Sequence, residues 1–152
     1  MRIVSSALVQ APAAQVWAFI EHYANDPRWR TGVSRMQQVT DGPVHAGAEV
    51  DEVIRILGRT IRSRVVVGSV EPGRSFTWRV IGGARASGRR WVRALDEHSS
   101  ELGTEKTLLL TGADRILAPI VAAVTRRAEL EDVRRAAALI ESASSDHKRS
   151  LV

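Results

Sequence analysis

The 152-residue sequence contains no cysteine, which excludes disulfides, thiolate nucleophiles and cysteine-bound metals. No apolar run approaches the ~18 to 20 residues that a membrane-spanning helix needs. The N-terminus passes from Met1–Val4 directly to Ser5 and Ser6, without the apolar stretch of a signal peptide. We therefore expect a cytoplasmic protein with no membrane span.

Sequence motifs for catalysis and metal binding are also missing. There is no GxSxG, P-loop or GxGxxG pattern, and the glycine-rich stretch 82–88 joins two predicted strands as a hairpin instead of preceding a helix. None of the four histidines has the spacing of a metal ligand. We expect no metal and no cofactor.

Lysine is scarce and arginine abundant, with 2 lysines against 20 arginines and a net charge of +5. An excess of positive charge of this size favours binding to an acidic partner. The paired arginines Arg89-Arg90, Arg126-Arg127 and Arg134-Arg135 are scattered over different predicted elements, whereas nucleic-acid-binding surfaces cluster their charges among aromatic side chains. We therefore do not expect nucleic acid as the partner.

Alternating and β-branched segments between turn signals predict about seven strands. These are Ile3–Gln10, Val33–Thr40, Glu49–Leu57, Thr60–Val70, Ser75–Ile81, Arg85–Leu95 and Thr104–Thr111. Pro12 favours a helix start at Ala13, and Asn25–Trp29 is expected as a short helical turn. The short connections predict an antiparallel meander.

From Asp114 the apolar period changes to about 3.6, which predicts a long C-terminal helix. Its expected apolar stripe consists of Ile116, Ile120, Val124, Leu130, Val133, Ala137 and Ile140. The last residues are polar. We expect one domain over 1–142 and a flexible polar tail over 143–152. A helix of this length can cover the apolar face of a curved antiparallel sheet.

The order of these segments resembles the START-like (SRPBCC) superfamily, and its polyketide cyclase/dehydrase-type branch above all. The residues that carry the likeness are Pro12, Val16-Trp17, Asp26-Pro27-Arg28-Trp29, Gly58-Arg59, Glu71-Pro72-Gly73-Arg74, Gly103-Thr104 and Leu117-Ala118-Pro119. The resemblance implies an α+β helix-grip fold: a curved antiparallel sheet of about seven strands wrapped on the C-terminal helix, with two short helices after the first strand. It also implies a cavity between sheet and helix.

Large apolar residues on neighbouring strands are the candidates for lining such a cavity, or alternatively for filling it as core. The aromatic wall is predicted from Phe76, Trp78 and Trp91, the floor from Val65, Val67 and Leu109, and the helix side from Ile120 and Val124. Arg93 alternates with Trp91 and is either an anchor for a ligand oxygen or an outward-facing arginine. A slip of one residue in register would invert each of these faces.

Three functions remain open at this point. The first is binding of a small hydrophobic or aromatic ligand, lipid- or polyketide-like, by a monomer or homodimer. The second is a polyketide aromatase/cyclase, for which Asp51, Glu52 or an arginine would supply acid–base chemistry. The third is an interaction module that uses the basic surface. The first two are distinguished by whether an ionisable side chain faces the cavity.

Overall fold

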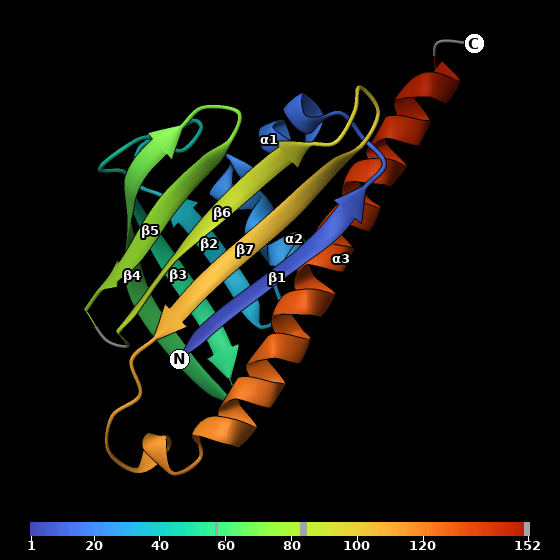
Figure 1. Ribbon diagram of the computed structural model, residues 1–152. Helices are drawn as coiled ribbons and strands as arrows, with labels where there is room; N and C mark the ends of the chain where they lie inside the picture. The colour runs from blue at the N-terminus through green and yellow to red at the C-terminus, as the bar shows by residue number, and fades with distance from the viewer. Residues whose placement is uncertain (57, 83–84, 151–152) are drawn as a thin grey trace.

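The computed structural model describes residues 1–56, 58–82 and 85–150 (Figure 1). Its strands are β1 (Arg2–Val9), β2 (Val33–Gln38), β3 (Glu49–Ile56), β4 (Arg59–Glu71), β5 (Ser75–Ile81), β6 (Ala86–Ala94) and β7 (Ser100–Leu108). Its helices are α1 (Ala13–Ile20), the 3-10 turn η1 (Tyr23–Asn25), α2 (Asp26–Trp29), the 3-10 turn η2 (Gly112–Arg115) and α3 (Ala118–Ser150).

The seven strands form one antiparallel sheet in the order β1-β7-β6-β5-β4-β3-β2. The first strand therefore pairs with the last, and β2 forms the opposite edge. Figure 1 shows the sheet curled into a half-barrel, with α3 running along its open side and the short helices inside the curl. This is the helix-grip arrangement that the sequence predicted.

The two ends of α3 pack differently. In its C-terminal half Val133, Ala137 and Ile140 are buried, and the helix lies mainly against β1. In its N-terminal half Ile120 and Val124 are exposed. The apolar stripe expected along the whole helix is therefore correct only for the second half.

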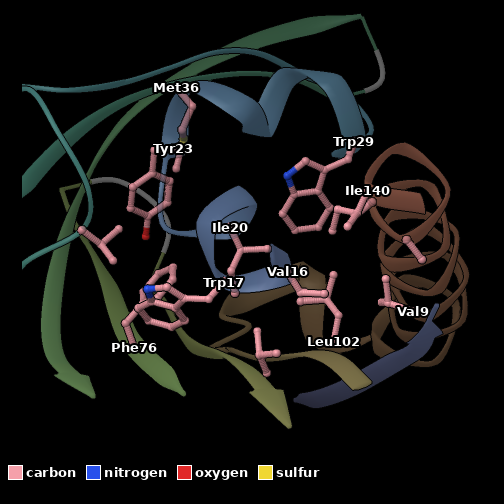
Figure 2. Packing of buried hydrophobic residues seen from close by; sticks show 14 of the residues in the cluster. Val9, Val16, Trp17, Ile20, Tyr23, Trp29, Met36, Phe76, Leu102 and Ile140 are labelled. Atoms are coloured by element: carbon pink, nitrogen blue, oxygen red, sulfur yellow. The ribbon is translucent and has the colours of Figure 1, made fainter. Parts of the chain in front are cut away.

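Aromatic side chains from distant segments form the centre of the core. The Phe76 ring on β5 contacts Trp17 of α1 edge-on, with ring centroids 6.1 Å apart, and Tyr23 of η1 at 5.8 Å. Edge-to-face contacts at such distances add to the burial energy of each ring. Figure 2 shows these rings together inside the curl of the sheet, with Trp29 closer to α3, which carries Ile140. The contacts fix α1 and η1 against the inner face of the sheet.

Two tryptophans lie over cross-strand glycines, one on each face of the sheet. Trp78 pairs with Gly88 and Trp91 pairs with Gly103. In both cases a Cβ on the glycine would collide with the indole ring. Each glycine therefore provides the space in which a flat ring covers the neighbouring strand.

Several element boundaries differ from the sequence-based prediction. β7 begins at Ser100, not Thr104, because the Asp96–Ser99 turn is tight: the His98 amide donates to Asp96 Oδ1 at 2.7 Å and the Leu95 amide donates to the Ser99 carbonyl at 3.0 Å. The segment 143–152 is helical as far as Ser150. The predicted hairpin turn at Gly83-Ala84 lies outside the described residues.

Gly103→Ala should lower the free energy of unfolding by about 1 to 3 kcal/mol, because the new methyl group would overlap the Trp91 ring. Denaturant unfolding followed by tryptophan fluorescence measures this change. Ser87→Ala, at an exposed position of β6, is the control and should stay within about 0.5 kcal/mol of the parent protein. Equal stability of Gly103→Ala would contradict the close packing of Trp91.

Candidate functional site

A cavity of about 220 Å³ lies between the inner face of the sheet, the η1–α2 segment and α3. Most of its wall is apolar. Its larger apolar side chains are Met36, Ile54, Ile56, Ile61, Val65, Trp78, Val80 and Leu108. They come from β2, β3, β4, β5 and β7, so the curl of the sheet brings them around one space.

One side of the cavity is polar and charged. The side chains that contribute are Tyr23, Arg30, Glu52, Ser63, Arg90 and Lys106. The Glu52 carboxylate accepts a hydrogen bond from the Ser63 hydroxyl at 2.8 Å and from Arg30 Nη1 at 3.1 Å. Ionisable groups therefore face the cavity, and the site is not purely hydrophobic.

Asp26 and Arg90 form a buried ion pair beside this polar side. Asp26 is completely buried and Arg90 is 4% exposed. Arg90 Nη1 donates to Asp26 Oδ1 at 2.9 Å, while Nη2 donates to Oδ2. Burial alone would lower the pKa of Arg90, but the facing carboxylate outweighs it, and the pKa lies above its ordinary value. The guanidinium is therefore permanently charged.

Three aromatic rings surround the same guanidinium. Its central carbon lies 4.9 Å from the ring centroid of Tyr23, 5.0 Å from that of Trp29 and 5.6 Å from that of Phe76. Cation–π contacts of this kind are strongest where water is excluded. Arg90 thus joins η1, α2 and β5 through one side chain.

Arg30 connects the buried pair to the cavity wall. Its Nη1 donates to Asp26 Oδ2 at 3.2 Å as well as to Glu52. Burial opposes the charge of Arg30, and the two carboxylates overcome this effect and raise its pKa. Asp26, Arg90, Arg30, Glu52 and Ser63 consequently form one continuous hydrogen-bonded chain from the core to the cavity.

The Tyr23 hydroxyl is an exception in this network. Tyr23 is 2% exposed and lines the cavity, yet among the described residues its hydroxyl has no hydrogen-bond partner. Burial raises the pKa of Tyr23, so the phenol is neutral and offers a proton donor. A buried donor without a partner costs free energy unless a bound molecule supplies the acceptor.

Lys106 is held by α3. Its ammonium pairs with Glu129, which also accepts a hydrogen bond from the Thr104 hydroxyl at 3.3 Å. Burial would raise the pKa of Glu129, but the nearby Lys106 charge lowers it below its ordinary value. Along the helix, burial raises the pKa of Asp132 although the Thr31 hydroxyl and amide donate to it. These contacts anchor α3 across the cavity.

Of the nine residues predicted for the site, Val65 and Trp78 line the cavity. Phe76 and Val67 are on the same inner face but are buried in the core, 0% and 1% exposed. Of the residues predicted either to line the cavity or to fill the core, some therefore do the one and some the other, on the neighbouring strands β4 and β5. The cavity lies nearer the β3–β4 hairpin than the Phe76 cluster does.

The strand register corrects the placement of Trp91 on the cavity face, and of the two alternatives for Arg93 it supports the outward-facing one. Trp78 pairs with Gly88, three residues before Trp91, so an odd offset turns Trp91 to the outer face. The inner positions of β6 are taken by Arg90 and Val92, both buried. Arg93 is exposed and pairs with Glu101 at 2.7 Å.

The predicted placement of Leu109, Ile120 and Val124 is also corrected. Leu109 lies beyond the end of β7 and is 61% exposed, while Ile120 and Val124 are 64% and 65% exposed. On α3 it is Thr125 that lines the cavity. A helix stripe of apolar residues does not by itself indicate which flank meets the sheet.

The sequence analysis did not identify Tyr23, Arg30, Ser63, Arg90 and Lys106, and it named Glu52 only as a possible catalytic group. Arg90 alternates with Gly88 and Val92, and that pattern is the signal that could have placed it inward. A guanidinium is normally assigned to the surface. The contrary placement depends on Asp26, 64 residues away.

The sequence model of the family described as "Polyketide cyclase / dehydrase and lipid transport" matches residues 1–138. The chain belongs to this family. No curated protein matches the chain in sequence. Membership of this family supports a ligand-binding or cyclase role.

Solved structures share the fold at low identity. TTHA0849 from Thermus thermophilus has a TM-score of 0.81 at 13% identity, covering 95% of this chain and 99% of its own. The Zhui aromatase/cyclase from Streptomyces sp. R1128 has a TM-score of 0.74 at 16% identity, with 93% of each chain covered. Norcoclaurine synthase from Thalictrum flavum has a TM-score of 0.68 at 13% identity, covering 95% of this chain and 96% of its own.

Within the described residues, no group of three His, Asp or Glu side chains is arranged to hold a metal ion. No helix in that part of the chain is long and apolar enough to cross a membrane.

Asp26→Asn should lower the free energy of unfolding by about 3 to 5 kcal/mol, because it leaves the Arg90 guanidinium buried without its counter-charge. Adding Arg90→Met should recover most of that loss, since an apolar replacement of both partners is often neutral. Glu101→Gln, which breaks the exposed pair with Arg93, should cost less than about 1 kcal/mol. Additive costs in the double variant, measured by urea unfolding, would contradict the coupling.

Proposed function

We propose that this protein binds a small, mostly apolar molecule that carries an oxygen acceptor, and that the cavity is the binding site. The observation that carries the proposal is Tyr23, which lines the mostly apolar cavity and whose buried hydroxyl has no hydrogen-bond partner among the described residues. Ligand sites typically combine apolar walls with a few convergent polar groups. This cavity has that composition.

The size of the cavity limits the ligand. A cavity of ~150 Å³ is sufficient for benzene, and drug-sized ligands occupy ~300 Å³ or more. At about 220 Å³, a compound of one or two rings is the class that fits. Trp78 offers a flat surface to a ring, and Tyr23 with Arg30 offers donors to a carbonyl or phenolic oxygen.

A pair of matched probes tests this proposal. 2-Acetylnaphthalene has a ketone oxygen, and 2-ethylnaphthalene has the same bicycle without it. The protein should bind the ketone about five- to tenfold more tightly, which corresponds to one hydrogen bond. Tyr23→Phe should abolish this preference while retaining the hydrocarbon's affinity. Quenching of tryptophan fluorescence or isothermal titration calorimetry gives both constants.

Arg93→Gln is the matched control for this experiment, because Arg93 lies on the outer face. Its binding constants should equal those of the parent protein. If neither probe binds, the cavity does not hold ligands of this class. If both bind equally to the parent protein, Tyr23 does not select for oxygen.

A second candidate function, cyclisation of a poly-carbonyl substrate, is favoured by Glu52. Glu52 is 6% exposed, and it lines the cavity beside Arg30. Binding of a mostly apolar molecule does not require a carboxylate at this position. Glu52 would remove a proton from the carbon next to a carbonyl, and Tyr23 and Arg30 would stabilise the enolate oxygen. The enolate carbon would bond to a second carbonyl carbon, and the resulting alkoxide would take up the proton held by Glu52. Glu52 would then remove a second proton from the same carbon, a carbon–carbon double bond would form as the C–O bond breaks, and the departing hydroxide would take up that proton and leave as water.

The first step of this reaction is testable with the same ketone. In D₂O the protein should accelerate hydrogen–deuterium exchange of the acetyl methyl group, as NMR measures it. Glu52→Gln should lower that rate by about 10² to 10⁴-fold and change the affinity for the ketone little. Asp51→Asn is the control, because the Asp51 carboxylate pairs with Arg64. With this variant the ketone should exchange at the same rate as with the parent protein. Absence of exchange in the parent protein would leave binding as the only function of the cavity.

A further inference from the structure

Lys106 differs from Arg30 and Arg90, the other cations that line the cavity, because its amine can act as a nucleophile. A guanidinium keeps its proton, whereas a lysine amine can lose its proton and bond to a carbonyl carbon. The sequence has 20 arginines and only two lysines, Lys106 and Lys148. A lysine in the cavity is therefore informative in a chain that otherwise relies on arginine for positive charge.

The strand register places Lys106 on the inner face of the sheet, on the same wall as Trp78. Gly88 of β6 pairs with Trp78 on one side and with Lys106 on the other. Because Gly88 has no side chain, the Trp78 ring lies over it. Lys106 and Trp78 both line the cavity. A ligand ring that stacks on Trp78 would therefore lie on the wall that carries the Lys106 amine.

Glu129 of α3 is positioned to accept a proton from this amine. The two side chains form an ion pair and are only 18% and 11% exposed. The Thr104 hydroxyl donates to the other carboxylate oxygen at 3.3 Å and thereby orients the carboxylate. An amine, an adjacent base and a third group that orients the base form the arrangement that activates nucleophiles for covalent chemistry.

A small recess adjoins the cavity at this ion pair. It has a volume of about 20 Å³, and Trp29, Thr104, Lys106 and Glu129 are among its lining residues. Trp29 is 1% exposed, and its indole nitrogen has no hydrogen-bond partner in the described part of the chain. About 15 Å³ with several polar partners is enough for one water molecule. The recess can therefore hold the water that condensation of an amine with a carbonyl releases.

We propose that Lys106 forms a reversible imine with the carbonyl group of an aldehyde or ketone in the cavity. Glu129 takes a proton from the ammonium group, and the nitrogen lone pair then bonds to the carbonyl carbon. A second proton moves from that nitrogen to the former carbonyl oxygen, which gives a carbinolamine. Glu129 returns its proton to the hydroxyl group, the C–O bond breaks, and water leaves an iminium ion on Lys106.

This inference rests on the proposed function, because a carbonyl compound must bind before it can react. It narrows the ligand class from any oxygen acceptor to an aldehyde or ketone. The positive iminium nitrogen withdraws electrons more strongly than a carbonyl oxygen does, so the protons on the neighbouring carbon become more acidic. Removal of such a proton by Glu52 would then be easier than from the free ketone.

Reductive trapping with 2-naphthaldehyde and sodium cyanoborohydride tests the imine. Cyanoborohydride delivers a hydride to the iminium carbon and converts the imine into a stable secondary amine. Mass spectrometry of the intact protein should show a single adduct, and peptide mapping should assign it to Lys106. In the urea-unfolded protein Lys106 and Lys148 should react alike, because the selectivity depends on the folded cavity.

Three variants separate the reaction from the structural role of the ion pair. Lys106→Arg keeps a positive charge opposite Glu129 but cannot form an imine, so it should fold and lose the adduct. Lys148→Arg is the matched control and should react at the rate of the parent protein. Glu129→Gln should lower the rate of adduct formation about 10²-fold, because the amine loses its proton acceptor. Circular dichroism should show that all three variants are folded.

An adduct on Lys148 or on the Met1 amine in place of Lys106 would overturn the proposal, and so would an unchanged rate in Glu129→Gln. Absence of any adduct would overturn it as well. Quenching of tryptophan fluorescence by the same aldehyde, without reductant, then shows which proposal has failed. An aldehyde that binds without reacting contradicts the imine alone, whereas an aldehyde that does not bind also contradicts the proposed function.

Discussion

The buried pair between Asp26 and Arg90 is the interaction on which the rest of the structure depends. Neither group can be buried alone, because an unpaired charge in a protein interior costs several kcal/mol. Asp26 belongs to α2, just after the first short helices, and Arg90 lies in the middle of the sheet. Their pairing therefore fixes the η1–α2 segment under the sheet at one position. The three rings around Arg90 limit its freedom further.

This constraint also explains why a cavity exists beside a well-packed core. The α1–α2 segment fills one end of the half-barrel with Trp17, Tyr23 and Trp29. The helices do not reach the other end, toward the β3–β4 hairpin, where the remaining wall is made by strands and by Thr125 of α3. Arg30 and Glu52 extend the buried charges to the boundary between these regions. The polar side of the cavity is thus the outer end of the network that holds the core together.

The sequence predicted the architecture well, because strand order, helix length and turn positions depend on local patterns. Periodicity and turn residues located β5, α1 and the C-terminal helix before any contact was known. The site was predicted poorly, because its residues depend on register and on pairing across the chain. In the sequence, Trp78 and Trp91 are about equally far from the turn between β5 and β6. In the structure Trp78 pairs with Gly88, three residues before Trp91, so the two indole rings lie on opposite faces of the sheet. Tyr23 and Arg90 owe their burial to partners that no local pattern reveals.

The buried ion pairs leave the net charge of the chain to the surface. Asp26, Glu52, Glu129 and Asp132 are buried, and four cations pair with them, namely Arg30, Arg90, Lys106 and Arg135. These carboxylates and cations balance, so the net charge of +5 belongs to the remaining side chains. Because an unpaired charge in the interior would cost several kcal/mol, the pairing that stabilises the core also keeps the excess of arginine on the exterior.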